Sequence, residues 1–185
     1  MDDIVKQAMA KWPHVPHCYG WLGLDARGNW YMRDDRAQAQ GAFTSGLRGA
    51  KGSLLQHAKL IEFIQRNYDC DAQGQWFFQN GPQRVYVELE TTPWVWRVAE
   101  GGAVHAHDGT PASVLRAVTD ELGWLYLETS KGFGLVHTQD VMHAANMIER
   151  GQWSLVEAAR QGLPQKYGFV LSPQQLQKDP LRKES

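Results

Sequence analysis

The sequence is poor in cysteine, in net charge and in long apolar runs. It has two cysteines, too few for a disulfide framework, and we expect reduced thiols in the cytoplasm. Its net charge of −1 argues against a uniformly basic surface for nucleic acid. No stretch approaches the roughly 20 apolar residues that span a bilayer. The N-terminus begins acidic and then becomes amphipathic, so it lacks the basic start and the continuous apolar run of a signal peptide. We therefore expect a cytoplasmic protein that binds neither nucleic acid nor membranes.

The composition is otherwise that of a globular protein. Of the 185 residues, 43% are hydrophobic and 21% are charged. A chain of this length buries roughly 70% of its unfolded surface and needs neither disulfides nor a metal to fold. We expect a single compact unit over residues 1–185, ending in a polar tail at 174–185. The 8 tryptophans are many for this length, and such large rings fill a core or line the rim of a pocket.

One short phrase occurs twice, as DARGNW at 25–30 and as DAQGQW at 71–76, with a looser third copy around Asp120. An Asp at the start of a tight turn accepts backbone N–H bonds from its own loop. The Gly supplies a positive φ, and the Trp packs on the strand that leaves the turn. We interpret the phrase as a hairpin signature and not as a catalytic motif. Its repetition predicts duplicated hairpin units, with half-motifs at about 18–68 and 69–150.

Hydrophobic periodicity predicts helices and a half-buried strand. Apolar residues recur at helical spacing over 2–11, over 53–68 with Ser53 as N-cap, and over 138–150 with Thr138 as N-cap. The segment 85–90 instead alternates apolar residues with polar or aromatic ones, as in a strand. Together these signals predict an α+β fold, in which duplicated antiparallel β-hairpin motifs form sheets and at least two amphipathic helices pack on them.

The order of these signals resembles that of a known family. The residues that carry the resemblance are the two phrases DARGNWY and DAQGQWF, the strand GPQRVYVELETTPW, and the segment LYLETSKGFGLVHTQDVMHAANMI. The chain is similar over roughly 18–148 to the uncharacterised proteobacterial family called domain of unknown function 1285, or to a sister family of it, because its connection over 33–53 is longer than the usual one in that family. The resemblance implies an α+β fold of repeated motifs, a cytoplasmic bacterial protein and a ligand-binding or signalling role. It implies no established enzyme activity.

The glycine-rich stretch 46–53 is the strongest candidate for a ligand site. It carries Arg48 and Lys51 and leads into the helix predicted from Ser53, and helix N-termini favour anions. The order Lys-Gly-Ser differs from the Gly-Lys-Ser of a P-loop, so the alternative is a flexible basic loop. We expect a cleft between the repeated halves. The expected ligand-binding residues, anion contacts followed by an aromatic wall, are Arg48, Lys51, Gly52, Ser53, Trp30 and Trp76.

Other polar groups have weaker patterns. His14, His17 and Cys18 suit zinc by type, but no second cluster at ligand spacing accompanies them, so we expect no metal. His137 and His143 have no nucleophile motif nearby, and we expect no catalytic residue and no cofactor. We expect the strand that carries Glu88 and Glu90 to present a solvated face.

The leading hypothesis is a non-enzymatic ligand-binding or signalling module for an anionic small molecule. The alternatives are an enzyme of unknown class that uses the histidine-rich segments, and an interaction module that binds a protein partner through exposed tryptophans.

Overall fold

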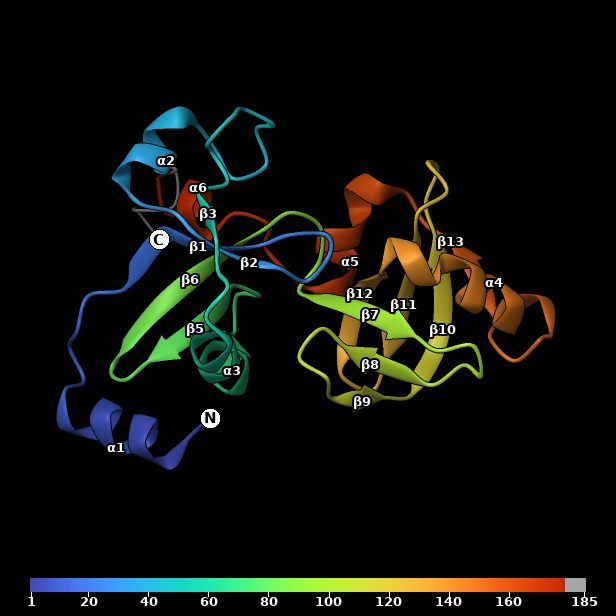
Figure 1. Ribbon diagram of the computed structural model, residues 1–185, viewed down its shortest axis with the longest axis horizontal. Helices are drawn as coiled ribbons and strands as arrows, with labels where there is room; N and C mark the ends of the chain where they lie inside the picture. Colours follow the sequence, from blue (N-terminus) through green and yellow to red (C-terminus); the bar gives the residue numbers. More distant parts are fainter. Residues whose placement is uncertain (179–185) are drawn as a thin grey trace. The chain divides into compact units, whose positions relative to one another are not determined.

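The computed structural model describes residues 1–178, and the chain groups into two compact units (Figure 1). Unit 1 contains Met1–Asp25, Asn29–Glu90 and the C-terminal part from Phe169. Unit 2 contains Ala26–Gly28 and Thr91–Gly168. Both units combine sheets and helices, so the α+β class predicted from the sequence is confirmed. The organisation as one unit, with half-motifs at about 18–68 and 69–150 and a polar tail at 174–185, stays a prediction, and residues 179–185 of that tail lie outside the described part of the chain.

Unit 1 is built on a six-stranded sheet in the order β3-β2-β1-β6-β5-β4. Its strands are β1 (Cys18–Leu24), β2 (Trp30–Met32), β3 (Ser53–Leu54), β4 (Tyr68–Cys70), β5 (Trp76–Asn80) and β6 (Gln83–Leu89). Its helices are α1 (Asp3–Lys11), α2 (Asp35–Gln40), α3 (Ala58–Arg66) and α6 (Pro173–Lys178). The helix α3 packs against β5, and α6 packs against β1 and β6.

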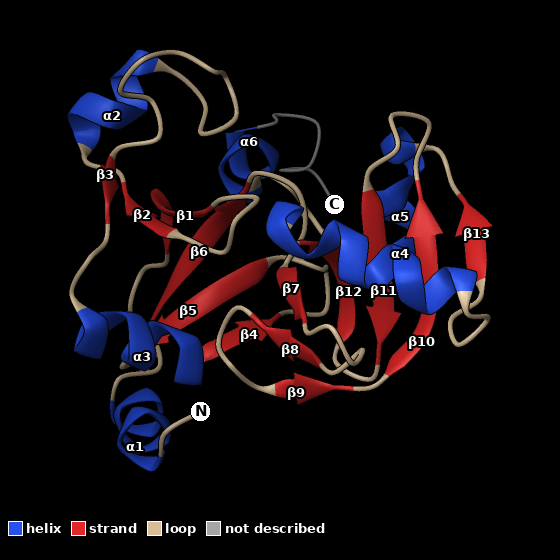
Figure 2. Ribbon diagram, turned by 45° about the vertical axis from the view of Figure 1, so that its right-hand side comes forward, coloured by secondary structure: helices blue, strands red, loops and turns tan. Residues whose placement is uncertain are grey.

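Unit 2 is built on a seven-stranded sheet in the order β13-β10-β11-β12-β7-β8-β9 (Figure 2). Its strands are β7 (Trp94–Val98), β8 (Val104–Ala106), β9 (Pro111–Ala112), β10 (Val114–Thr119), β11 (Leu125–Thr129), β12 (Gly132–Val136) and β13 (Leu155–Glu157). Two helices, α4 (Val141–Glu149) and α5 (Leu163–Tyr167), follow the 3-10 turns η1 (Thr138–Asp140) and η2 (Arg160–Gly162).

The two units share one strand topology. In each, two three-stranded antiparallel meanders are joined through a parallel pair of strands, β1 with β6 in unit 1 and β7 with β12 in unit 2. In both cases the first strand of the first meander pairs with the last strand of the second meander. Unit 2 adds only β13, parallel to β10, to this arrangement among its described strands. The duplication of hairpin motifs predicted from the sequence is therefore seen in the strand order.

The repeated phrase forms the hairpin loop that the sequence predicts. In all three copies the Asp side chain accepts the backbone N–H four residues later, at 2.8, 2.9 and 2.8 Å. The glycine of each copy has a positive φ, between +77° and +83°, and the Trp lies at or just before the start of the outgoing strand. The loops 71–75 and 120–124 occupy equivalent places in the two units, between the first two strands of the second meander.

The same loop also forms without an Asp at its start. At 99–103 and 106–110 the first residue donates to the fifth carbonyl, at 2.9 and 2.8 Å, and the fourth residue donates back to the first, at 2.8 Å in each. Gly102 and Gly109 take the positive φ there. The glycine, which closes a type I turn with a bulge, is therefore common to all these loops, whereas the Asp side chain is an addition in three of them.

Two predicted helix starts are wrong. Residues 53 and 54 form β3, where they pair with Met32 and Tyr31, and α3 begins only at Ala58 with His57 as its N-cap. Leu54 fits the apolar helical stripe, but a neighbouring strand offers it backbone partners that periodicity cannot reveal. The last helix begins as a 3-10 turn, and His137, not Thr138, caps it by accepting the N–H of Gln139. The helix predicted at 2–11 is confirmed as α1.

Candidate functional site

The predicted anion-binding loop leads into the strand β3 and not into a helix. Arg48 and Ser53 are exposed, and Gly52 has a φ of +81°. Lys51 is already engaged, because its Nζ lies 2.8 Å from Glu90 Oε1 and 5.5 Å from the ring centre of Tyr31. The helix dipole expected at Ser53 is absent from this loop, since α3 begins at Ala58. The four predicted anion contacts lie near one another because they are close in the sequence. They are Arg48, Lys51, Gly52 and Ser53.

The predicted aromatic wall lies elsewhere in unit 1. Trp30 is only 1% exposed and belongs to the core. Its ring packs edge-on against Tyr68 at 5.2 Å between centroids, and Tyr68 in turn contacts Trp76 at 4.7 Å. The structure therefore brings Trp30 and Trp76 together through Tyr68, in a cluster that supports the sheet. Their expected contact with a ligand stays a prediction.

A fully buried arginine fastens the loop to the sheet. Arg33 follows β2 and has no exposed surface. Its guanidinium donates to the carbonyls of Ala50, Gly20 and Gly41, at 2.8, 3.1 and 2.6 Å. Burial lowers the pKa of Arg33, while the carboxylate of Glu88 raises it. No sequence pattern predicts this role of Arg33, because its three acceptors are backbone carbonyls.

Glu88 on β6 is a buried carboxylate, and the solvated strand face predicted for it is wrong. It is 2% exposed, and its oxygens accept hydrogen bonds from the Ser172 hydroxyl and, at 3.0 Å, from the backbone N–H of Gln174. Burial raises the pKa of Glu88, and those two hydrogen bonds together with Arg33 and Lys178 partly offset the increase. The residues that bury Glu88 lie more than eighty positions later in the chain. The periodicity of a strand cannot predict such a distant contact.

Glu88 lies in the wall of a hollow of about 400 Å³ within unit 1. One side is formed by the α2–β3 loop and the end of β6, and the other by the C-terminal segment. Apolar side chains and a few polar groups line it together, which is the usual make-up of a small-molecule site. The lining residues are Ala42, Thr44, Glu88, Leu89, Glu90, Val170, Leu171, Ser172, Gln175 and Leu176.

The raised pKa of Glu88 gives a signed prediction for stability against pH. A carboxyl group that binds its proton more tightly in the folded state than in the unfolded state contributes stability at low pH. That contribution is lost as the pH rises through the folded-state pKa. The Glu88→Gln variant lacks this titration. We therefore expect its free energy of unfolding, relative to wild type, to increase with pH from about 4 towards 7.

Urea unfolding of both proteins over this pH range measures the difference. The lowered pKa values of Asp108 and Asp140 act equally on the two proteins and cancel. A difference that instead decreases with rising pH would mean that the attraction of Arg33 outweighs burial at Glu88.

A second hollow in unit 1 is apolar and holds about 270 Å³. It lies where α3 faces β1, β5 and β6, and its lining includes Leu22, Ile64 and Phe78. Trp21 and Met32 stand at its edge and are 42% and 50% exposed. Exposed Trp side chains are typical of interaction surfaces. A protein partner remains the alternative prediction for this surface.

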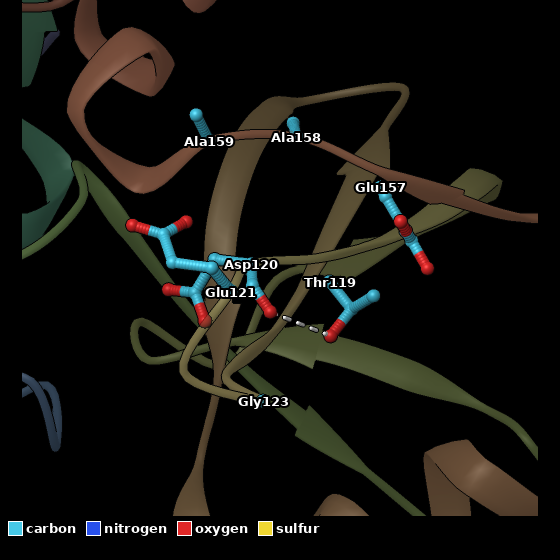
Figure 3. Close-up of a pocket in the computed structure, with 7 residues that line it drawn as sticks. All are labelled: Thr119, Asp120, Glu121, Gly123, Glu157, Ala158 and Ala159. Carbon is cyan, nitrogen blue, oxygen red and sulfur yellow. Dashed lines mark hydrogen bonds between the residues drawn. The ribbon is translucent and has the colours of Figure 1, made fainter.

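A third hollow, of about 720 Å³, is an open depression in unit 2 whose lining includes Asp120, Glu121 and Glu157 (Figure 3). Two of these carboxylates make structural hydrogen bonds. Asp120 accepts from Tyr126 and from its own loop, and Glu121 accepts the backbone N–H of Arg160 at 2.8 Å. Glu121 and Glu157 are exposed. We therefore place the candidate site at Glu88, where a buried charge and an apolar wall coincide.

Three histidines of unit 2 make structural contacts. His137 caps η1, the Nδ1 atom of His143 lies 2.9 Å from the carbonyl of Val98, and His107 accepts the backbone N–H of Val95 at 3.3 Å. Within residues 1–178, no group of three or more His, Cys, Asp or Glu side chains could hold a metal ion. An enzyme that uses the histidine-rich segments stays an alternative prediction.

Comparison with known proteins decides the family. A family model described as "Protein of unknown function (DUF2946)" matches residues 1–174. The chain belongs to this family. A search of curated proteins finds no match. None of the helices in the described part of the chain is long and apolar enough to cross a membrane.

Two solved structures are similar to the chain, and both are DUF1285 family proteins, the family that the sequence resembles. The protein from Shewanella baltica OS155 is 18% identical, with a TM-score of 0.45 over 68% of this chain and 91% of that one. The protein from Silicibacter pomeroyi DSS-3 is 11% identical, with a TM-score of 0.47 over 80% of this chain and 85% of that one.

Proposed function

We propose that the protein is a cytoplasmic ligand-binding module, and that the hollow beside Glu88 binds a small molecule with an acidic group and an apolar part. The observation that carries the proposal is the hollow itself, about 400 Å³ in volume, with a carboxylate that is 2% exposed in its wall. This volume falls in the range of small-molecule sites. The location in the cytoplasm is supported by Cys18 and Cys70, which are both free thiols.

The charges around the hollow favour an acidic ligand over a basic one. Glu88 is opposed by Arg33 and Lys178, and Glu90 is bound by Lys51. Both carboxylates of the wall therefore have cationic partners. Arg48 adds a further exposed cation on the loop whose earlier residues form one side of the hollow. An acidic group at the rim would meet Arg48 and Lys51, and Arg48 could offer it a bidentate fork.

The rest of the ligand would lie against apolar side chains. Leu89 and Leu176 belong to opposite sides of the hollow, and Ala42 leaves space on the loop side. Each Å² of apolar surface removed from water contributes about 25 cal/mol. A compact apolar group would therefore strengthen binding beyond what two charges at a wet rim supply, which is on the order of 1 kcal/mol each.

A thermal-shift screen tests the proposal with three ligand classes: phosphate- or carboxylate-bearing metabolites, amines, and neutral polar compounds. We expect acidic compounds with an apolar part to raise the Tm of the wild type. The double variant Arg48→Ala/Lys51→Ala should lose this response and keep the fold, because the ion pair between Lys51 and Glu90 is partly exposed and contributes at most about 1 kcal/mol.

Two further variants sharpen the screen. Lys59→Ala removes an exposed charge from α3 and should respond as the wild type does. Ala42→Leu fills the hollow without changing any charge and should also abolish binding. If no acidic compound raises the Tm, if only amines do, or if the double variant keeps the response, the proposal is wrong.

A further inference from the structure

The C-terminal segment Phe169–Lys178, called the strap below, returns to unit 1 after the chain has built unit 2. Two backbone hydrogen bonds hold its first part. Val170 donates to the carbonyl of Gly74 at 2.9 Å, and the carbonyl of Leu171 accepts the N–H of Leu89 at 2.8 Å. The strap thereby extends the backbone pairing at the end of β6 without joining the sheet as a strand.

The second part of the strap is held by side chains, and Glu88 is their centre. Its carboxylate accepts the hydroxyl of Ser172 and the backbone N–H of Gln174, at the first turn of α6. Ser172 also caps that turn, because its Oγ accepts the N–H of Gln175 at 3.2 Å. The side chain of Gln174 donates to Gln38 of α2 at 2.7 Å. Glu88 thus fastens the start of α6 to β6.

The strap also forms one complete side of the hollow. Val170, Leu171, Ser172, Gln175 and Leu176 face the α2–β3 loop and residues 88–90 across it. Leu171 and Gln175 are exposed on their outer surface. Phe169 and Pro173 are buried, but every other residue of the strap is half-buried or exposed. A short segment held in this way, with much of its surface exposed, opens locally at a lower free energy than a core strand does. Movement of the strap would open the hollow while leaving the sheet of unit 1 in place.

We propose that the strap is a gate to the hollow and that Glu88 is its latch. This inference rests on the proposed function only for the ligand that would enter the hollow. The local opening of the strap does not depend on any ligand. When the strap opens, Glu88 exchanges its two internal hydrogen bonds for water, so the carboxylate is relieved of the burial that raises its pKa. Because a charged carboxylate gains hydration when the strap opens, its charge lowers the free energy of opening. A neutral side chain at position 88 would not have this effect.

Native-state hydrogen exchange tests the gate without any ligand. We expect the amides of Leu89, Gln174 and Leu176 to exchange at least about tenfold faster than the core amides of β1 and β5, through an opening that is insensitive to low denaturant. Ser172→Ala should speed exchange of the strap amides by about a further tenfold, the effect of one lost hydrogen bond to a charged group. It should leave the β1 and β5 amides unchanged.

Two variants serve as controls. Gln177→Ala alters an exposed side chain on α6 and should change nothing. Glu88→Gln removes the charge and keeps one acceptor oxygen for the N–H of Gln174, while its NH2 group can donate to the Ser172 hydroxyl. It should slow opening of the strap or leave it unchanged. The gate is overturned if the strap amides exchange only with global unfolding of unit 1, or if Ser172→Ala speeds all amides of that unit equally.

Inorganic phosphate, the simplest acidic probe, separates this inference from the proposed function. If phosphate enters the hollow and holds the strap closed, the exchange rate of the strap amides should fall in proportion to the fraction of protein that remains unbound. If exchange is unchanged by phosphate and by every acidic compound of the screen, the acidic ligand is wrong, while local opening of the strap still establishes the gate.

Discussion

Replacing Arg33 with methionine should lower the free energy of unfolding by about 3–5 kcal/mol, the cost of breaking one partner of a buried charged network. Methionine has a similar length but no donor. The carbonyls of Gly20, Gly41 and Ala50 would lose the hydrogen bonds that now measure 3.1, 2.6 and 2.8 Å. Each buried acceptor left without a donor costs about 1–3 kcal/mol, and Glu88 would also lose the attraction of its buried cation.

Urea unfolding followed by tryptophan fluorescence measures this effect. Arg36→Met is the matched control, because Arg36 is exposed on α2, and its effect should stay within about 0.5 kcal/mol. Arg33→Lys should fall between the two, since one ammonium group cannot reproduce the planar fork that serves three carbonyls. A loss below about 1 kcal/mol for Arg33→Met would show that water replaces the guanidinium and that the loop is not fastened through it.

Replacing Asp120 with alanine should lower the free energy of unfolding by about 3 kcal/mol. The side chain is 6% exposed and accepts hydrogen bonds from the N–H of Leu122, the N–H of Trp124 and the hydroxyl of Tyr126, at 3.0, 2.8 and 2.8 Å. Hydrogen bonds to a charged group are worth about 1.5–3 kcal/mol each, but bonds to one side chain are not additive. Burial and the neighbouring carboxylate raise the pKa of Tyr126, so its hydroxyl stays a donor at neutral pH.

The Asp120→Asn variant distinguishes the contribution of the two backbone hydrogen bonds of the loop from that of the Tyr126 hydrogen bond. Its amide oxygen can keep the two backbone bonds while the carboxylate acceptor of Tyr126 is lost, and the cost should be about 1 kcal/mol. Asp71→Ala removes the equivalent side chain of unit 1, which is less buried and accepts from Tyr86 at 3.1 Å, so its loss should be smaller. Glu157→Ala, at an exposed position, is the control. Equal losses for Asp120→Ala and Glu157→Ala would contradict the proposed role of the loop.

The hairpins could be predicted because their causes are local. An Asp that accepts N–H groups of its own loop, a Gly with positive φ and a Trp on the outgoing strand all act within six residues. All three copies of the phrase have the predicted geometry. The helix start predicted at Ser53 is wrong because a non-local partner decided the outcome. Ser53 and Leu54 satisfy the helical pattern, yet their backbones pair with β2.

The candidate site could not be predicted as a site, and of its lining only the strand with Glu88 and Glu90 stands out in the sequence. The alternation over 85–90 correctly indicates a strand, but it cannot tell which outer face a later segment will cover. Glu88 is buried because the segment with Ser172 and Gln174, which follows unit 2 in the sequence, covers its carboxylate. Arg33 is one arginine among several in the sequence, and nothing in its neighbourhood marks it as the one that three carbonyls will surround.

The sequence by itself determined the α+β class, the hairpin loops and their repetition, because turn chemistry and short-range periodicity act over a few residues and need no partner. Only the tertiary structure decided how the meanders join through the parallel pairs β1–β6 and β7–β12, and which polar groups are removed from water. Parallel pairing and burial depend on segments that are dozens of residues apart. Their free energy is settled by what packs against each group, and this information is not contained in any local stretch of the chain.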